Sequence, residues 1–452
     1  MNKGLWRVIL AASVGTLFEW YDFYLYGSLA IFFGDLFFPP GNDRAALLAS
    51  LATFGAGFGV RPLGALVFGR IGDLVGRKYT FLITMVTMGL STALIGFLPT
   101  YASVGLLAPV LLVALRLLQG LALGGEYGGA ATYVAEHVPD NKRGFYTSFI
   151  QTTATLGFFL SLGMIGWCRT AYSTAEFKEF GWRIPFLASF LLLAVSLYIR
   201  VKMSESPLFA RLKSDGKLSK NPLTESFVHA KNRRLVLIAL FGATAGQGVV
   251  WYTGQFYALT FLQKPLNLHW TLAYTVVATA LVLGTPLILF FGWLSDRIGR
   301  KRIMLLGCLL AALTYVPLYA GMKHLANPGL LASVTSLETG ALLGLIALVF
   351  VQMIYVAMVY GPMAAFLVEL FPTSIRYTSM SLPYHLGNGW FGGFLPLIAT
   401  AATTSSWAVS TFGESAIYAG LIYPILVCLL TLVVGGLYLH ETKDHKIDTP
   451  FH

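Results

Sequence analysis

The chain has 452 residues, of which 56% are hydrophobic and only 11% are charged. Soluble proteins carry about 25% charged residues, so most of this surface must face something other than water. Many apolar stretches reach the roughly 20 residues that a helix needs to span a bilayer. The formal charge of +11 does not indicate a nucleic-acid partner, because the cations lie in the gaps between these stretches, as expected of a membrane protein.

Twelve apolar segments predict an all-α integral membrane protein with twelve transmembrane helices. The first six run over 7–33, 46–69, 79–98, 104–135, 144–167 and 184–200, and the last six over 233–262, 270–294, 302–322, 339–369, 379–404 and 415–439. The stretch between them, 201–232, is rich in Lys, Ser and Pro and is expected to be a cytoplasmic linker. We therefore predict an N-terminal six-helix bundle over 1–200 (the first half) and a C-terminal six-helix bundle over 233–452 (the second half).

Positive charges are distributed unequally between the two sides of this map. The side that holds both termini carries 23 of the 31 Lys and Arg residues and the other side carries 6, while Arg61 and Arg116 lie within spans. This asymmetry predicts that both termini and the linker face the cytoplasm. We expect a multi-pass protein of a bacterial inner membrane, working as a monomer.

Two charged phrases each occur twice in the chain. The phrase at 69–78 (GRIGDLVGRK) returns at 292–301 (GWLSDRIGRK), an offset of 223. Glu136-His-Val-Pro139 with Arg143 returns as Glu369-Leu-Phe-Pro372 with Arg376, an offset of 233. Two mostly apolar half-length repeats are typical of secondary transporters, in which two bundles rock about a central site.

Ionisable residues within the predicted spans are concentrated in the first half. A charge inside a span costs at least about 2.5–3.5 kcal/mol on insertion scales, so each one requires a reason. The second half holds only His385, and the second offset matches Arg116 and Glu126 with Val349 and Val359. We infer that the first half handles a proton and that the second half mainly shapes a substrate pocket. The first-half set is Glu19, Asp22, Arg61, Arg116 and Glu126.

Asp22 with Arg116 is the predicted proton-coupling pair. Burial favours the protonated form of an acid and a nearby Arg favours the ionised form. An acid whose Arg partner comes and goes with conformation can therefore bind and release a proton. A permanent ion bridge that only fixes helix packing is the alternative. For Glu19, which shares a helix face with Asp22, function and packing are equally supported.

The other polar residues within spans have weaker signals. Glu126 lies in the glycine-rich stretch 123–129 (LGGEYGG), which favours close helix approach and an acid facing a cavity, so we assign it a coupling role. Arg61 precedes Pro62 near a cytoplasmic loop, and snorkelling to the head groups is at least as favoured as ligand binding. A lone histidine such as His385 is more often structural. Aromatic residues at helical spacing are more often packing groups than pocket walls, which applies to Trp251, Tyr252, Tyr257, Tyr355, Tyr384 and Trp390.

The duplicated loop phrases resemble the signature of the major facilitator superfamily, and Arg116-Leu-Leu-Gln119-Gly120 resembles its fourth-helix motif. The resemblance covers nearly the whole chain and implies two pseudo-symmetric six-helix bundles. Its metabolite:proton symporter family includes carriers of α-ketoglutarate, citrate, shikimate and related acids, and of proline and betaine. The stretches similar to that family are Glu19-Trp-Tyr-Asp22-Phe-Tyr, Arg61-Pro62, Gly124-Gly-Glu-Tyr-Gly-Gly129 and Glu369-Leu-Phe-Pro-Thr-Ser-Ile-Arg-Tyr377.

The resemblance implies roles at matching positions. Asp22 stands where proton-coupled sugar carriers have their first-helix proton acceptor, and Arg116 where they have its partner. Glu126 and Tyr127 stand where phosphate carriers have an acid and a substrate-contacting tyrosine, and Gln151 resembles their ligand-binding glutamine. A cytoplasmic charge latch that holds the outward-open state would comprise Asp73, Arg77, Glu136, Arg143, Asp296, Arg300, Glu369 and Arg376.

We therefore predict a proton symporter that takes up a small polar metabolite by alternating access. The tail after His440 is short and has no heptads, unlike the coiled-coil tail of osmosensing betaine/proline carriers, which favours an organic acid. A uniporter, exchanger or exporter of the same fold, a proline/betaine-type carrier and a transporter-like receptor are the alternatives. Neither enzymatic activity, a cofactor nor a metal site is expected, since no phosphate loop, metal triad or nucleophile–base set is evident. Substrate candidates from the second half are Tyr252, Gln255, Tyr360 and His385.

Overall fold

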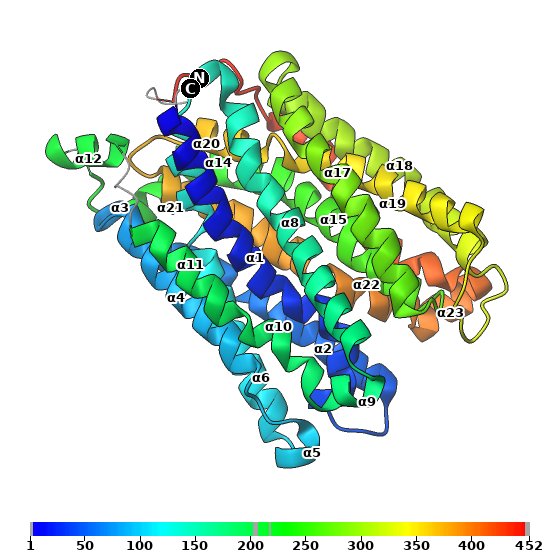
Figure 1. Ribbon diagram of the computed structural model, residues 1–452. Helices are drawn as coiled ribbons and strands as arrows, with labels where there is room; N and C mark the ends of the chain where they lie inside the picture. Colours follow the sequence, from blue (N-terminus) through cyan, green and yellow to red (C-terminus); the bar gives the residue numbers. More distant parts are fainter. Residues whose placement is uncertain (1–2, 202–206, 217, 448–452) are drawn as a thin grey trace.

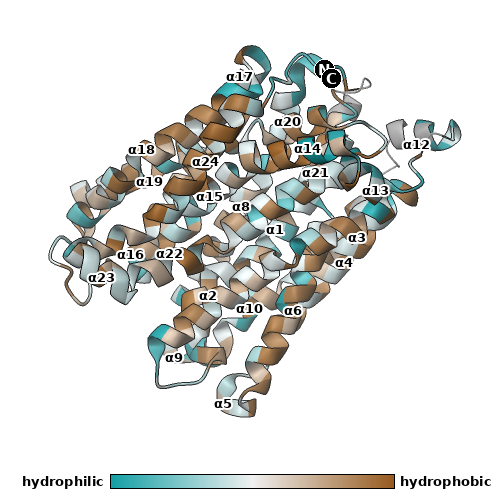
Figure 2. Cartoon of the chain, turned by 180° about the vertical axis from the view of Figure 1, so that it is seen from behind, coloured by the Kyte–Doolittle hydropathy of each residue, from teal (hydrophilic) through white to brown (hydrophobic). Residues whose placement is uncertain are grey.

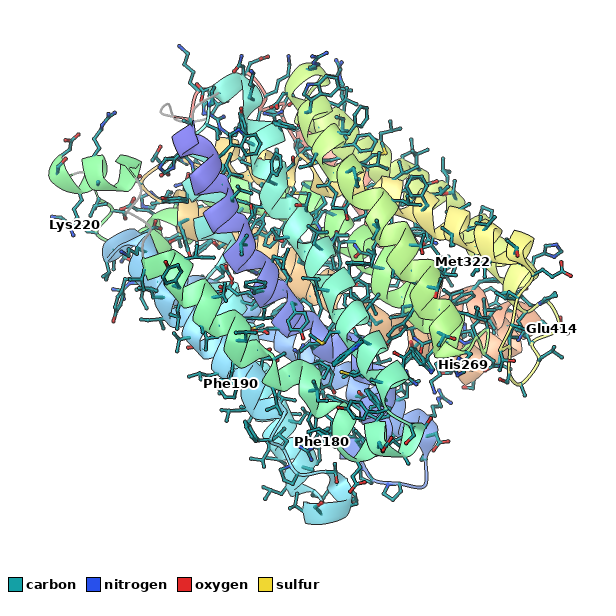
Figure 3. All side chains as sticks on the ribbon, in the orientation of Figure 1. Phe180, Phe190, Lys220, His269, Met322 and Glu414 are labelled. Carbon is teal, nitrogen blue, oxygen red and sulfur yellow. The ribbon has the colours of Figure 1, made fainter. Side chains whose placement is uncertain are left out.

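The computed structural model describes residues 3–201, 207–216 and 218–447. These residues form a bundle of long helices joined by short loops, and the two ends of the chain lie side by side at one end of the molecule (Figure 1). We call this end the terminal end and the other the opposite end. Figure 3 shows Lys220 toward the terminal end and His269 and Glu414 toward the opposite end.

The first half is built from helices that are broken at several points. Short helical pieces α5 (Tyr101–Val104), η1 (Asp140–Lys142), α9 (Thr174–Glu176) and η2 (Phe177–Gly181) join the long ones. The long units are α1 (Lys3–Phe37), α2 with α3 (Asp43–Gly59 and Arg61–Leu74), α4 (Arg77–Ile95), α6 with α7 (Leu107–Gly124 and Tyr127–Ala135), α8 (Arg143–Ala171), and α10 with α11 (Arg183–Leu187 and Ser189–Val201).

The second half repeats this plan after α12 (Pro207–Ser214) and α13 (Pro222–Phe227). Its first unit joins α14 (Ala230–Ala239), η3 (Leu240–Thr244), α15 (Ala245–Tyr252), η4 (Thr253–Tyr257) and α16 (Ala258–Gln263). The others are α17 (Trp270–Ile298), α18 (Arg300–Ala326), α19 with α20 (Thr339–Tyr360 and Met363–Leu370), α21 with η5 and α22 (Arg376–His385, Leu386–Gly393 and Leu395–Thr403), and α23 with η6 and α24 (Ser406–Phe412, Gly413–Leu421 and Ile422–Tyr438).

Within the described residues, ten of these units are long and apolar enough to cross a membrane. Two more units, α1 and α21–η5–α22, complete the set of twelve. Both carry buried polar side chains that lower their apolar character, Glu19 and Asp22 in α1 and His385 and Asn388 in the other. The predicted all-α, twelve-helix membrane fold is confirmed.

Large apolar side chains cover the outside of both halves. Leu191 is 69% exposed, Leu313 66% and Leu437 71%. Figure 2 shows the hydrophobic colour on the flanks of α3, α6, α18 and α19, and the hydrophilic colour mostly toward the two ends. An apolar surface of this extent is stable when it faces lipid hydrocarbon, so these flanks are the membrane-facing surface.

Glycines allow the broken units α2–α3 and α6–α7 to pack backbone against backbone. A Cβ atom at Gly120 would lie 1.8 Å from the carbonyl oxygen of Gly57, and one at Gly124 would lie 2.2 Å from that of Arg61. Both distances are impossible for a side chain, so only glycine permits this approach. The predicted close packing at Gly124 is confirmed, and it places the helix breaks at Arg61 and Glu126 near each other.

The duplicated charged phrase has the same backbone geometry in both copies. Gly76 precedes α4 with φ 138°, and its counterpart in the second copy, Gly299, precedes α18 with φ 108°. Positive φ angles in this range are strained for residues with a Cβ atom. The repeated glycine thus turns the chain in the same way in each half and directs the charged residues around it to the terminal end.

Candidate functional site

A buried charge network joins the two halves at the terminal end. Glu369 is its centre: its carboxylate accepts hydrogen bonds from Arg143 at 3.0 Å, from Arg300 at 3.0 Å and from the hydroxyl of Thr442 at 2.7 Å. Arg300 also pairs with Asp296 at 2.7 Å. Arg143 belongs to the first half and the others to the second, so the network crosses the boundary between the halves.

Two aspartates make a matching pair of contacts across this boundary. Asp296 accepts the backbone N–H groups of Gly144 at 2.8 Å and Phe145 at 2.9 Å, at the start of α8. Asp73 accepts the backbone N–H and the hydroxyl of Thr378, at 3.2 and 2.6 Å, at the start of α21. Asp73 and Asp296 are counterparts under the first offset, and Phe145 and Thr378 are counterparts under the second. Each carboxylate lies at the positive end of a helix from the other half, which stabilises the contact.

Arg376 completes this set of contacts. Its guanidinium lies 3.8 Å from the Glu136 carboxylate of the first half and donates to the carbonyl oxygen of Ile447 at 2.6 Å. Seven of the eight residues predicted for the latch thus lie in contacts that close the terminal end. The side chain of the eighth, Arg77, lies outside the described residues.

The C-terminal segment 441–447 is part of the closed end, which the sequence did not predict. Glu441 accepts the backbone N–H groups of Arg300 at 2.8 Å and Lys301 at 3.1 Å, at the start of α18. Thr442 and Ile447 contact Glu369 and Arg376, as described above. An acid favours the start of a helix, but this preference alone does not identify which helix it will contact. Glu441 and α18 are far apart in the sequence, so only the fold shows that they meet.

Asp22 is buried on α1 and faces the α10–α11 junction. The hydroxyl of Ser189 donates to its carboxylate at 2.5 Å, and the neighbouring Tyr21 hydroxyl donates to the carbonyl oxygen of Pro185 at 2.9 Å. Asp22 and Arg116 are both described, and they do not form an ion pair. In this conformation Asp22 contacts Ser189 while Arg116 contacts Gln119 and Phe23, so the predicted pairing in another conformational state stays a prediction.

Arg116 is fully buried on α6. Its guanidinium donates to the side chain of Gln119 at 2.7 Å and to the carbonyl oxygen of Phe23 at 3.2 Å. It also lies over the rings of Phe23 and Tyr26, 4.2 and 4.7 Å from their centroids. These cation–π contacts and carbonyl acceptors stabilise the charge without a carboxylate. Since Phe23 follows Asp22 directly, Arg116 is nevertheless close to the predicted proton acceptor along α1.

Glu126 and Glu19 are both buried on the first-half side of the centre. Glu126 stands at the break between α6 and α7 and accepts the hydroxyl of Thr16 on α1 at 3.2 Å. Glu19 lies one turn further along α1 and is 3% exposed. The structure thus brings Glu19, Asp22 and Glu126 to α1 and its neighbours, as the sequence predicts, while their roles stay predictions.

Tyrosines from both halves meet at the boundary between them. Tyr127 of α7 stacks on Tyr384 of α21, with ring centroids 3.5 Å apart and planes 3° apart. The hydroxyl groups of Tyr384 and Tyr360 lie 2.9 Å apart, and the amide of Gln151 donates to the Tyr360 carbonyl oxygen at 2.9 Å. Three of the predicted substrate residues, Tyr127, Gln151 and Tyr360, therefore lie in one cluster, which also contains Tyr384.

The remaining substrate candidates of the second half are also buried. Tyr252 packs on Phe58 of the first half, with centroids 5.1 Å apart, and so lies at the boundary. His385 follows Tyr384 and lies with it at the centre. Gln255, within the π-helical turn η4, is fully buried and neither polar atom of its amide has a hydrogen-bond partner in the described residues. Polar atoms of this kind are unusual in a folded core and favour a ligand-binding role.

Arg61 is fully buried at the start of α3, so the snorkelling interpretation is wrong. Its guanidinium lies 5.3 Å from the ring centroid of Trp20 and 5.1 Å from that of Phe58. No described acceptor lies in hydrogen-bonding geometry to any of its three nitrogens, and no described carboxylate pairs with it. The backbone of Arg61 packs closely on α6 at Gly124, where a Cβ atom would lie 2.2 Å from its carbonyl oxygen. The sequence signal that could have indicated this is the Arg-Pro pair next to glycines 57 and 59.

Toward the opposite end the two halves contact each other, and the Tyr274 hydroxyl of α17 donates to the carbonyl oxygen of Ser28 on α1 at 2.9 Å. A cavity of about 400 Å³ lies there between α2 of the first half and α16, α22 and η6 of the second. The lining includes Arg44, Leu47, Tyr257, Lys264, Thr404 and Ile417.

A twice-repeated helical membrane bundle, closed by charges at one end and polar at its centre, defines a secondary transporter. The family model of the Major Facilitator Superfamily matches residues 12–382, and the chain belongs to this family. The inner membrane metabolite transport protein YhjE of Escherichia coli K12 is 35% identical over 454 residues, covering 98% of this chain and 95% of that protein. The shikimate transporter of the same organism is 34% identical, with 88% of this chain and 88% of that protein covered.

Solved structures show the same fold. The proton:xylose symporter XylE superposes with a TM-score of 0.77 over 99% of this chain and 98% of that chain, at 18% identity. The predicted resemblance to metabolite carriers of this superfamily is confirmed, and the protein is a multi-pass membrane transporter of metabolites, not an enzyme.

Proposed function

We propose that the protein is a proton-coupled symporter that takes up a small organic acid by alternating access. The observation that carries this proposal is the unequal distribution of buried ionisable groups. Asp22, Glu19 and Glu126 cluster around α1 in the first half, whereas the second half contributes tyrosines, amides and His385 to the centre. A carrier needs carboxylates for a proton and a polar surface for a substrate, and here each half supplies one of the two.

Asp22 is the proposed proton acceptor, with Ser189 as its partner in the present conformation. A serine hydroxyl donates to an ionised carboxylate and can turn to accept from a protonated one. The bond of 2.5 Å therefore holds Asp22 in either protonation state. Arg116 contacts the carbonyl oxygen of the next residue, Phe23, and a conformational state that brings its guanidinium to the Asp22 carboxylate would favour release of the proton.

The charge network at the terminal end is the proposed inner gate. We place the terminal end in the cytoplasm, in agreement with the excess of Lys and Arg on that side. The closed network around Glu369 then corresponds to an outward-facing state, and the cavity beside Tyr257 faces the periplasm. Opening the inner gate requires breaking the contacts of Asp73, Asp296 and Glu369 together, which makes the change of state cooperative.

The substrate class is supported by two features. A relative is named as a shikimate transporter, and shikimate is a small hydroxylated acid. The boundary between the halves also carries hydroxyl and amide groups that can donate hydrogen bonds to such a ligand. The proposed substrate contacts, all buried, are Tyr127, Gln151, Tyr252, Gln255, Tyr360 and His385.

Uptake into proteoliposomes tests the proposal directly. Labelled small organic acids, with proline and betaine included in the panel, are offered under an inward proton gradient with and without a protonophore. Accumulation of one acid that collapses with protonophore supports symport of an organic acid. Accumulation of proline or betaine instead would move the substrate to the osmolyte class. Equilibration that is indifferent to protonophore would refute proton coupling and favour a uniporter or exchanger.

A further inference from the structure

Arg61 is a buried cation whose guanidinium makes no hydrogen bond to any described residue. Its side chain is 0% exposed, and its Nε and both Nη atoms have no hydrogen-bond partner there. The other fully buried arginines differ: Arg143, Arg300 and Arg376 contact acids, and Arg116 has a side-chain acceptor and backbone carbonyl oxygens. A guanidinium carries five N–H donors in a planar fork that matches a carboxylate, so this one is equipped to bind an anion.

The surroundings of Arg61 belong to both halves. Trp20 of α1 and Phe58 of α2 lie against the guanidinium from the first half. From the second half, Tyr252 packs on Phe58 with ring centroids 5.1 Å apart, and Tyr384, with His385 beside it, lies at the same boundary, where it stacks on Tyr127. A cation at the boundary between two rocking halves is where a transported ligand must be held, because both halves contact the ligand there in either state.

The second half has no charged residue at the position that matches Arg61 under the first offset. The first offset matches Arg61 with Gly284, which packs on Met353. Among the described residues the centre thus offers one arginine, Arg61, whose three nitrogens all lack a hydrogen-bond partner, beside aromatic rings. A single arginine of this type matches a ligand that has one carboxylate and is otherwise uncharged. A second carboxylate would find no second arginine without hydrogen-bond partners among the described residues.

We propose that Arg61 binds the carboxylate of the transported substrate, with the rings of Trp20 and Phe58 fixing the plane of the guanidinium and Tyr384 and His385 contacting the ligand from the second half. This inference rests on the proposed function only in so far as the substrate is a carboxylate. It holds for organic acids, proline and betaine alike, because all of them carry that group.

The positioning of Arg61 follows from the backbone around it. Pro62 fixes the start of α3, and the carbonyl oxygen of Arg61 packs against Gly124, where a Cβ atom would lie only 2.2 Å away. The side chain therefore leaves a rigid point of the first half, so the cation moves with that half when the halves rock. A ligand held by Arg61 is carried past the second-half groups Tyr384 and His385 during the change of state.

The test measures binding separately from proton coupling. Arg61→Gln, Arg61→Lys and the control Arg169→Gln are purified, and substrate exchange is measured at equal pH on both sides of the vesicle. Arg169 is a matched control because its guanidinium also lies over a tryptophan, 4.0 Å from the ring centroid of Trp270, away from the centre. We expect Arg61→Gln to raise the half-saturating substrate concentration by about 100-fold or more, Arg61→Lys by less, and Arg169→Gln to leave it unchanged.

Thermal unfolding of the same variants distinguishes a ligand-binding cation from a structural one. If the role of Arg61 is to bind an anionic substrate, the ligand-free Arg61→Gln variant unfolds at the same temperature as the ligand-free parent or at a higher one. Adding substrate then no longer raises the unfolding temperature of the variant. A lower unfolding temperature of the empty variant, with substrate affinity retained, would overturn the proposal. If the parent exchanges the acid and Arg61→Gln does so with normal affinity, the role of Arg61 is wrong and the proposed function stands. Transport of only carboxylate-free solutes by the parent would refute both.

Discussion

The substitution Glu369→Gln tests whether the charge network holds the terminal end closed. The carboxylate accepts from Arg143, Arg300 and Thr442, and all of these contacts are buried. Gln keeps the shape but removes the charge, which leaves two buried arginines without their central acid. Breaking a buried ion pair by removing one partner costs about 3–5 kcal/mol. The cost falls on the closed state, because an open end would hydrate both arginines.

The expected consequence is a shift of the conformational equilibrium by roughly a hundredfold to a few thousandfold toward the state open at the terminal end, since each 1.4 kcal/mol corresponds to about tenfold. Spin labels at Lys142→Cys in the first half and Arg302→Cys in the second report the separation of the halves at this end. Cys168, Cys308 and Cys428 are buried and need not be replaced if they stay unlabelled. The parent should give one short distance and Glu369→Gln a longer one.

The control for this experiment is Glu338→Gln, which removes an exposed carboxylate just before α19, away from the network. It should leave the distance distribution of the parent unchanged. If Glu369→Gln also left it unchanged, the network would not hold the terminal end closed and the assignment of an inner gate would be refuted.

Three further substitutions test other parts of the structure. Asp22→Asn should abolish proton-driven accumulation while substrate exchange at equal pH continues; full accumulation by this variant would remove Asp22 from proton coupling. Gly120→Ala should lower the unfolding temperature in detergent, because the new Cβ atom would lie 1.8 Å from the carbonyl oxygen of Gly57. Overpacking of this kind costs about 1–3 kcal/mol or more. An unchanged unfolding temperature would show that α2 and α6 can move apart without cost. Glu441→Gln removes the charge-assisted bonds to the start of α18 at Arg300, worth about 1.5–3 kcal/mol each, and should open the terminal end less than the loss of Glu369 does; spin-label distances identical to those of the parent would contradict a role for the tail.

The repeated phrases contain residues that lie at the terminal end, where the family resemblance implied a charge latch. Asp73 and Asp296 were matched by the repeat, and the structure places both at helix starts of the opposite half. Local sequence carries part of this signal, because both copies have a glycine, Gly76 and Gly299, at the turn where the backbone takes a positive φ angle. The sequence could not supply Glu441, since its partner helix begins far earlier in the chain and no periodicity links the two.

The ionisable residues predicted within the spans are buried in the structure, and their functional roles stay predictions. Asp22 was matched with Arg116, whereas the structure gives it Ser189 and gives Arg116 the side chain of Gln119 and the Phe23 carbonyl oxygen. Hydropathy and spacing identify which side chains are in the membrane. They do not fix the rotation of one helix against the next, which decides whether two side chains meet.

By itself the sequence determined the class of the protein: the lack of charged residues, the length of the apolar stretches and the repeated phrases require a membrane bundle of two related halves. Only the tertiary structure decided which side chains lie at the boundary between those halves. Arg61 is the clearest case, because its depth depends on how closely α3 packs on α6, and that distance is set by Gly124 on a different helix. The physical reason is that burial in the membrane is a property of a segment, whereas the hydrogen bonds that a buried side chain makes or lacks depend on how all the helices pack.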